Sequence, residues 1–264
     1  MAGTGRRTRA DDVPGAASGL SFRGDARALS FGERAAAYEA HRPGYPPEVV
    51  RWLLEPAGAA ARVLDVGAGT GKLTRVVAAA GHAVTGVDPD PGMLAELRTA
   101  VPGVRTLEGT GEAIPVDDGA VDAVTVAQAW HWMDHPAAAA EFARVLRPGG
   151  VVGLVWNVLD PEDAMARRLA ALTGREDVVD RARDGELVLP HGAFGPGEAF
   201  TADNSHTTTV DELVALVATW SWVARGPDPG SVLERVRGLA AEHADGSGTL
   251  QYRLRTRAHR FARR

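Results

Sequence analysis

Glycines and aspartates lie together at two neighbouring places in the sequence, in an arrangement that suits a ligand carrying adenosine. Residues 65–71 read Asp-Val-Gly-Ala-Gly-Thr-Gly and complete a short apolar run. Glycine lets a backbone turn tightly and approach a ligand with no side chain between them. Asp88 ends the next apolar run, where a carboxylate can accept both hydroxyl groups of a ribose. Together these features predict a site for an adenosine-bearing cofactor.

The spacing of the glycines argues against a dinucleotide such as NAD. A dinucleotide-binding turn has the pattern G-x-G-x-x-G, whose third glycine lets the helix pack closely on the strand. Counted from Gly67, that third position holds Lys72, and the glycines instead follow a G-x-G-x-G pattern at Gly67, Gly69 and Gly71. An NAD-dependent oxidoreductase is therefore disfavoured.

Strands and helices alternate around these residues. A helix that begins at Ser30 and a second one opened by Pro46 and Pro47 precede the first strand. Short apolar runs then alternate with amphipathic stretches, which predicts strands over 62–66, 83–87, 104–107, 121–126 and 151–156 and helices over 72–80, 91–99 and 136–146. This alternation is typical of an α/β, doubly wound (Rossmann-like) sheet that is mostly parallel.

The last third of the chain breaks that alternation. Residues 158–200 read as a substrate-side insertion, helical and then loop-like, and strict alternation over residues 250–256 predicts a C-terminal strand with arginines on a solvated face. A further strand over 205–210 and helices over 211–220 and 231–243 lie between them. We expect a seven-stranded sheet with this last strand antiparallel, in a single domain over 21–264 with an N-terminal lid over 30–47 and a disordered tail over 1–20.

The composition excludes several classes of protein. The chain has no cysteine, which excludes disulfides, thiolate zinc sites and cysteine nucleophiles. Its net charge of −5 gives no basic footprint for nucleic acid. No apolar run is long enough to cross a membrane, and the N-terminus has no secretory signal. We therefore expect a cytoplasmic monomer or homodimer, with no nucleic-acid or membrane partner.

Four motifs resemble those of class I S-adenosylmethionine-dependent methyltransferases. Residues 63–71 resemble the glycine-rich first motif, and residues 86–89 resemble the acidic second motif. Residues 108–115 are similar to the segment that surrounds the adenine ring in these enzymes. Residues 144–150 match the turn that precedes their fifth strand.

A fifth group of residues resembles one branch of that superfamily. Residues 127–132, together with Tyr38, Arg42 and Tyr45, resemble the bacterial enzymes of the trans-aconitate methyltransferase type, which act on small molecules. The resemblance covers residues 30–157 well and the remainder in outline. It implies that the upstream segment is a lid, with Arg42 near the carboxylate of the cofactor.

The resemblance also implies which residues bind S-adenosylmethionine. The glycine-rich loop would line the methionine part and the ribose, and Asp88 would hold the ribose hydroxyls. Thr110 stands where many relatives have an aspartate for the adenine amino group, so a neutral hydroxyl would have to accept that bond. The expected cofactor residues are Tyr38, Arg42, Asp65, Gly67, Ala68, Gly69, Gly71, Asp88, Pro89, Met93, Thr110, Gly111, Glu112, Ala127 and Gln128.

The methyl acceptor is expected beside the cofactor, where strands end in aromatic residues. Parallel sheets bind ligands beyond the carboxyl ends of their strands. His131 is the candidate general base, although it could instead only order its loop. His131 and His135 have a metal-binding spacing, but Pro136 starts the helix too late for that geometry, so no metal is expected. The expected acceptor contacts are Tyr45, Trp130, Trp132, Trp156 and Trp220.

The sequence thus predicts an enzyme that transfers a methyl group from S-adenosylmethionine to an oxygen or nitrogen of a small, apolar or aromatic molecule. The sulfonium methyl is already activated, so alignment can supply about 7–11 kcal/mol of the barrier without a covalent intermediate. One alternative is a regulatory protein that binds the cofactor without turnover. Another is a nucleic-acid methyltransferase, which is disfavoured because residues 127–130 read Ala-Gln-Ala-Trp and not the Asn-Pro-Pro-Tyr type of loop.

Overall fold

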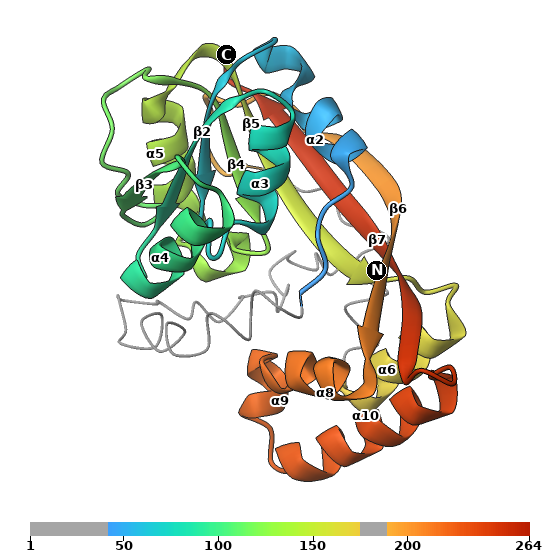
Figure 1. Ribbon diagram of the computed structural model, residues 1–264. Coiled ribbons are helices and arrows are strands. Elements are labelled where there is room, and N and C mark those ends of the chain that lie inside the picture. The colour runs from blue at the N-terminus through green and yellow to red at the C-terminus, as the bar shows by residue number, and fades with distance from the viewer. Residues whose placement is uncertain (1–41, 175–188) are drawn as a thin grey trace, which may run out of the picture.

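The computed structural model describes residues 42–174 and 189–264, and its centre is one seven-stranded sheet (Figure 1). The strand order is β3-β2-β1-β4-β5-β7-β6. The strands are β1 (Arg62–Val66), β2 (Ala83–Asp88), β3 (Arg105–Glu108), β4 (Val121–Ala127), β5 (Leu146–Leu159), β6 (Glu198–Thr209) and β7 (Thr249–Ala262).

The direction of pairing confirms the expected fold class. Strands β1 to β5 pair in parallel, while β7 runs antiparallel to both β5 and β6. Because β1 lies between β2 and β4, the strand order reverses beside β1. A doubly wound sheet binds its ligand at such a reversal, outside the carboxyl ends of the strands.

Helices cover both faces of the sheet. The face covered by α2 (Pro47–Leu54) and α3 (Lys72–Ala79) buries Leu53 and Val77 against strand residues such as Val155. The opposite face carries α5 (His135–Val145), whose Phe142 packs on Leu154. The α4 helix (Pro91–Ala100) packs against β2 and β3. We call the first surface the α2 face and the second the α5 face.

Capping residues fix where the helices near the glycine-rich loop begin. The side chain of Asp90 accepts hydrogen bonds from the backbone N–H groups of Gly92 and Met93, and Pro91 is the first residue of α4. Asp134 caps α5 in the same way through Ala137 N–H. A capping aspartate satisfies N–H groups that have no partner inside the helix.

The strands β5 and β6 are longer than predicted. We expected β5 to end at Trp156 and β6 to begin at Ser205, but β5 continues to Leu159 and β6 begins at Glu198. The reason is pairing, since Leu159 pairs with Leu254 of β7 and Glu198 pairs with Arg260. The predicted ends of these two strands are therefore wrong by a few residues, while the insertion over 158–200 stays a prediction.

Within the described residues, four helices form a unit on the extensions of these long strands, which we call the helical unit. They are α6 (Ala164–Leu172), α8 (Val210–Ala218), α9 (Ser221–Ala224) and α10 (Pro229–His243). Leu169, Leu213 and Leu239 of these helices pack together with Leu250 and Tyr252 of β7. In Figure 1, β7 runs from this unit to the far end of the sheet, where the C-terminus lies.

The arginines of β7 are more engaged than a solvated strand face implies. Arg253 and Arg255 form ion pairs of 3.3 Å and 3.1 Å with Asp160, a side chain with no exposed surface. The guanidinium of Arg260 lies 4.4 Å from the ring centre of Trp52. The predicted arginine face is solvent-accessible but not merely solvated, because the buried carboxylate of Asp160 pairs with two of its cations, whereas Arg260 lies over Trp52 on the opposite face.

Two predicted segments lie wholly or mostly outside the described residues, and a third, the insertion over 158–200, is described except for residues 175–188. The tail over 1–20 and most of the segment over 30–47, including Tyr38, lie in the part of the chain that is not described. Within residues 42–174 and 189–264, no helix is long and apolar enough to cross a membrane.

Candidate active site

The glycine-rich loop after β1 is held against the end of β2 by its own backbone. The N–H groups of Gly67 and Ala68 both donate to the carbonyl oxygen of Val87, at 2.8 Å and 3.1 Å. Gly67, Gly69 and Gly71 all have positive φ angles, of 67°, 54° and 91°. Residues with a side chain rarely adopt this conformation, so the glycines are required by the path of the loop.

Asp88 links the glycine-rich loop to the residues that begin α4. One carboxylate oxygen accepts from the N–H of Gly69 and the other from the N–H of Asp90, both at 2.9 Å. The side chain is 8% exposed, and burial raises the pKa of its carboxyl group above the ordinary value despite these bonds. A carboxylate oxygen can accept more than one hydrogen bond, so each oxygen can still receive a ligand hydroxyl.

Asp65 lies beneath the loop and has no direct access to a ligand. Its side chain is 1% exposed and accepts hydrogen bonds from the hydroxyl groups of Thr74, at 2.6 Å, and Thr125, at 2.9 Å. Burial raises the pKa of Asp65 to about 6, and the two hydroxyl bonds act in the opposite direction. Asp65 therefore ties β1 to β4 and α3, and its predicted role in cofactor binding is limited to holding the loop in place.

Buried polar atoms without partners gather around the same loop. Among the described residues, the hydroxyl of Thr70 and one carboxylate oxygen of Asp90 are buried and have no hydrogen-bond partner. Such groups are costly unless a ligand or water completes them. A side chain added at Gly69 would meet only open space. An adenosine-bearing ligand fits a loop that is open at one glycine and lined by unpaired polar atoms.

Met133, which follows β4 and was not among the predicted site residues, closes one side of the site beside the segment that precedes β4. A Cβ atom at Gly111 would lie 2.5 Å from the sulfur of Met133, and one at Gly67 would lie 3.7 Å from the Met133 methyl carbon. Met133 therefore lies between the two glycine positions. The carboxylate of Glu112 accepts from the N–H of Asp134 at 2.8 Å and holds this loop to the start of α5. Thr110 is exposed.

The turn after β4 is strained. Gln128 has a φ of 56°, which is uncommon for a residue with a side chain. Its N–H donates to the carbonyl oxygen of Val155 and its side-chain amide donates to the carbonyl oxygen of Asn157, both at 3.0 Å. Non-glycine residues in this conformation concentrate at functional sites. Ala127 ends β4 directly before this turn, and the predicted roles of both residues toward adenine stay predictions.

The aromatic residues after β4 divide between core and surface. Trp130 is 4% exposed, stacks on His135 with ring centres 4.5 Å apart, and also contacts Phe142. Its ring therefore belongs to the core on the α5 face. Trp132 is 43% exposed, and the ring of His131, also exposed, lies 4.8 Å from it. Of the tryptophans predicted after this strand, Trp132 is the one that offers surface to a ligand.

The other predicted acceptor residues are spread over the described chain. Trp156 is half-buried on the α5 face with its ring 6.2 Å from that of His259, whereas Tyr45 packs against the apolar cluster of the α2 face. Trp220 belongs to the helical unit and lies beside Trp222, with ring centres 5.1 Å apart. The structure thus does not bring the whole predicted set together, and their contacts with an acceptor stay predictions.

Two further predicted cofactor residues lie at the start of α4, and the structure describes both members of the predicted histidine pair. Met93 is buried in the first turn of α4, and Pro89 lies half-buried after Asp88. His135 bonds through Nε2 to the carbonyl oxygen of Trp130 at 3.2 Å. Within the described ranges there is no group of three or more histidine or acidic side chains that could hold a metal ion.

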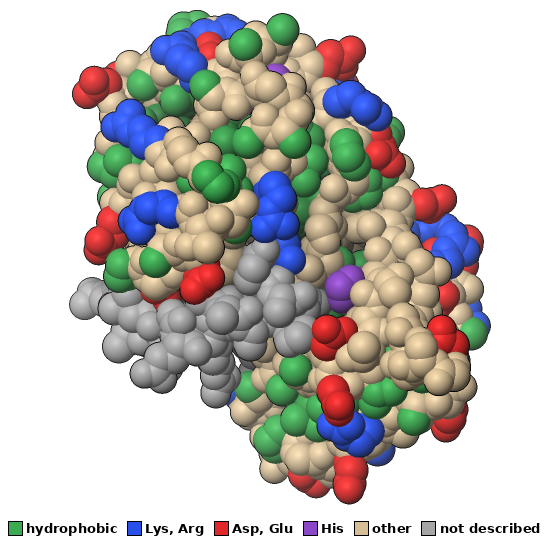
Figure 2. Space-filling model, in the orientation of Figure 1, with side chains coloured by type: hydrophobic (Ala, Val, Ile, Leu, Met, Phe, Trp, Pro, Cys, Tyr) green, Lys and Arg blue, Asp and Glu red, His purple; other side chains and the backbone are tan. Residues whose placement is uncertain are grey.

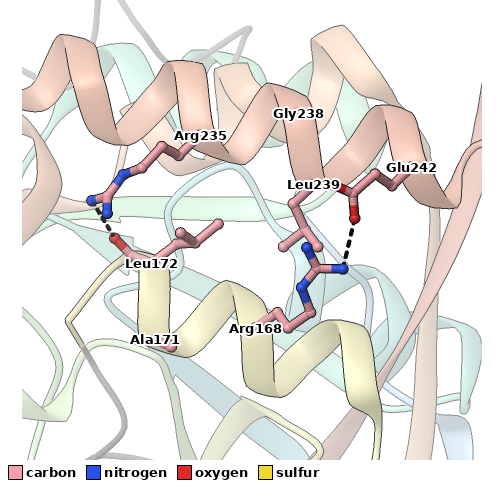
Figure 3. Close-up of a pocket in the computed structure, with 7 residues that line it drawn as sticks. All are labelled: Arg168, Ala171, Leu172, Arg235, Gly238, Leu239 and Glu242. Carbon is pink, nitrogen blue, oxygen red and sulfur yellow. Dashed lines mark hydrogen bonds and ion pairs between the residues drawn. The ribbon is translucent and has the colours of Figure 1, made fainter.

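A separate pocket lies between α6 and α10, in the helical unit (Figure 3). It has a volume of about 300 Å³, and none of its lining residues comes from the glycine-rich loop. Arg168 pairs with Glu242 across it at 2.7 Å, and Arg235 bonds to the carbonyl oxygen of Leu172 at 3.5 Å. Its arginines are therefore occupied, and the pocket is distinct from the candidate active site.

The class of protein follows from the sheet and the loop together. A doubly wound sheet has its glycine-rich loop at the reversal beside β1, and a buried carboxylate ends β2. The seventh strand enters antiparallel to β5. This combination defines the class I methyltransferase fold.

Known proteins identify the family. Residues 64–154 match the model of a methyltransferase domain. The chain is 48% identical over 217 residues to an uncharacterized methyltransferase of Mycobacterium tuberculosis (strain ATCC 25618 / H37Rv), covering 81% of this chain and 87% of that protein. It is 37% identical over 250 residues to the malonyl-[acyl-carrier protein] O-methyltransferase of Pectobacterium atrosepticum, covering 89% and 95%.

A solved structure agrees with this assignment. It is presented as a type II methyltransferase from Anaeromyxobacter dehalogenans, and it matches 84% of this chain and 97% of its own with a TM-score of 0.59 and 28% identity. The chain belongs to the S-adenosylmethionine-dependent methyltransferases.

Proposed function

We propose that the chain binds S-adenosylmethionine with the glycine-rich loop and Asp88, and transfers its methyl group to an oxygen or nitrogen of a small, largely apolar or aromatic molecule. The observation that carries the proposal is Asp88, whose two oxygens are aligned by the N–H groups of Gly69 and Asp90 at the reversal of the strand order. When bound, the cofactor supplies a methyl group on a positively charged sulfur.

The residues around Asp88 would share the work of binding. Asp88 would accept hydrogen bonds from the ribose hydroxyls. The space beside Gly69 is open, so the ligand could approach the backbone closely there. Met93 and the segment 110–112 would border the adenine ring, with Met133 as a further wall beside Gly111. Excluding water and aligning the acceptor would then be the main contribution of the chain to the rate.

The surface after β4 supports a small acceptor with an apolar or aromatic body. Trp132 exposes much of its ring, and the neighbouring His131 can take a proton from an acceptor oxygen or nitrogen as it attacks. The malonyl-[acyl-carrier protein] O-methyltransferase relative supports an oxygen as the atom methylated. The segment 127–132 supports the finer proposal of a place near the trans-aconitate methyltransferases.

The charge distribution gives little support to a nucleic-acid substrate. Over the described surface seen in Figure 2, basic and acidic side chains are interspersed, and no broad patch of one sign covers that face. A nucleic-acid enzyme normally carries a basic stripe. A protein that binds the cofactor without turnover is the remaining alternative, and an exposed histidine beside an exposed tryptophan supports turnover instead.

Calorimetry with S-adenosylhomocysteine, the demethylated product, tests the binding half of the proposal. The Asp88→Ala variant should bind about 30- to 1,000-fold more weakly, because two charge-assisted hydrogen bonds are worth about 2–4 kcal/mol together. Asp117→Ala is the matched control, since Asp117 is an exposed carboxylate outside the site. NAD should not bind. Equal affinity for NAD, or an Asp88→Ala variant that binds like the wild type, would contradict the proposal.

A further inference from the structure

Three polar side chains interrupt an otherwise apolar surface beneath α2. Asn157 of β5, Asn204 of β6 and Thr256 of β7 lie on the α2 face, where Ala202 and Ala258 belong to the apolar cluster. Thr256 has no exposed surface, and both asparagines are half-buried. Polar groups on a packed face are destabilising unless they are fully paired, so their pairing is informative.

The three side chains pair with one another. The hydroxyl of Thr256 donates to Oδ1 of Asn157 at 2.6 Å. Nδ2 of Asn204 lies 3.2 Å from Oδ1 of Asn157 and 3.1 Å from Oγ1 of Thr256. The trio forms a closed triangle across three adjacent strands, and we call it the amide clasp.

The amide clasp forms hydrogen bonds with the backbone of the segment that precedes α2. Nδ2 of Asn157 and Nδ2 of Asn204 each donate to the carbonyl oxygen of Gly44 at 3.0 Å. Gly44 is exposed, and a Cβ atom there would have no neighbour within 4 Å. The path of the chain at Gly44 is thus set by these two hydrogen bonds and not by packing of its own residue.

The same clasp connects to the candidate active site. The strained residue Gln128 donates its side-chain amide to the carbonyl oxygen of Asn157, so Asn157 is held from the cofactor side as well. Next to Gly44, Tyr45 packs on the apolar cluster of the α2 face. At the other end of the segment, burial raises the pKa of the Tyr252 hydroxyl, and the charge of Arg42 acts on that pKa in the opposite direction.

We infer that Asn157, Asn204 and Thr256 are positioning residues, which fix residues 42–46 at the carboxyl edge of the sheet and thereby set the affinity of the site for its cofactor. The effect on affinity rests on the proposed function, whereas the effect on the chain ahead of α2 does not. The outer strands β6 and β7, far from the glycine-rich loop in the strand order, thus contribute to the site through hydrogen bonds.

Substitutions that remove the donors test this inference. Asn204→Asp replaces the amide nitrogen by a charged oxygen that faces the Gly44 carbonyl, with little change of shape. Thr256→Val removes the hydroxyl, and Thr256→Ser keeps it. Gln251→Glu is the matched control, because Gln251 is an exposed amide on β7 that bonds across to β6 at Ser205 and Thr207, with no contact to Gly44.

Two measurements are made on each folded variant, hydrogen exchange across residues 44–54 and calorimetry with S-adenosylhomocysteine. In Asn204→Asp and Thr256→Val, exchange should speed up at least about tenfold at Val49, whose N–H donates to the carbonyl oxygen of Pro46 at 3.1 Å. The dissociation constant should rise at least about fivefold, in line with the loss of one buried hydrogen bond. Thr256→Ser and Gln251→Glu should match the wild type in both.

The two measurements test the inference and the proposed function separately. Unchanged exchange in Asn204→Asp and Thr256→Val would overturn the positioning role. Faster exchange with unchanged affinity would overturn its link to the site. Equal effects in Gln251→Glu would also overturn it, since any amide-to-acid change on these strands would then suffice. A wild type that fails to bind S-adenosylhomocysteine would contradict the proposed function, while the exchange measurement would still decide the role of the clasp.

Discussion

Replacing the buried carboxyl group of Asp65 should change how the stability of the protein depends on pH. Asp65 is 1% exposed, and its side chain accepts hydrogen bonds from the hydroxyls of Thr74 and Thr125 and from the backbone N–H of Thr74. Asp65→Asn keeps the shape and removes the charge. Since a hydroxyl can donate or accept, the amide can receive a hydrogen bond from one threonine and donate one to the other. The variant should therefore fold.

The size of the effect follows from the pKa of Asp65, which burial raises from 3.8 to about 6. Below pH 3.8 the carboxyl group is protonated in both states. Between pH 3.8 and 6 the unfolded chain loses this proton and the native chain keeps it, so the free energy of unfolding falls as the pH rises. The loss is complete above pH 6 and amounts to about 3 kcal/mol, at 1.36 kcal/mol for each pKa unit.

Urea denaturation between pH 4.5 and 7.5, followed by tryptophan fluorescence, measures this difference. Over that interval the free energy of unfolding of Asp65→Asn should rise by about 2 kcal/mol relative to the wild type, because the variant has no buried charge to form. Asp117→Asn, which removes an exposed charge, should track the wild type. If the free energies of unfolding of Asp65→Asn and the wild type changed with pH in the same way, the argument that ionisation of Asp65 destabilises the native state would be refuted.

Two further predictions concern the walls of the site. Gly111→Ala should weaken binding of S-adenosylhomocysteine by about tenfold or more, because its Cβ would lie 2.5 Å from the Met133 sulfur, and adding Met133→Ala should recover much of that loss. A double variant as weak as the single one would place the effect elsewhere. His131→Ala should lower the methylation rate by about a hundredfold and leave cofactor affinity within twofold, as measured by kinetics and calorimetry. Full activity would make His131 a structural residue.

The cofactor half of the fold could be predicted because its signals are local. The loop glycines and the acid at Asp88 each act within a few residues of sequence, and the structure has them after β1 and at the end of β2, as predicted. Even there, burial was harder to foresee. Trp130 and Trp132 are two residues apart, yet one is in the core and the other exposed, because the 3-10 turn η3 (Trp130–Trp132) points them differently.

The remainder depends on contacts between distant segments. The lengths of β5 and β6 are set by pairing with β7, about a hundred residues after β5, and no local pattern encodes that register. The amide clasp joins Asn157, Asn204 and Thr256 to Gly44, so the role of each residue cannot be predicted from its local sequence. Met133 was missed for the same reason, since its place between Gly67 and Gly111 depends on three loops meeting.

Methyl transfer itself tests the central claim most directly. The chain is incubated with S-adenosylmethionine labelled in its methyl group and with a cell extract separated into small-molecule, protein and nucleic-acid fractions, and Asp88→Ala serves as the inactive control. We predict that label appears in the small-molecule fraction, in compounds that organic solvent extracts, and that Asp88→Ala abolishes it. Label found only in nucleic acid or protein, or transfer that Asp88→Ala leaves intact, would contradict the account.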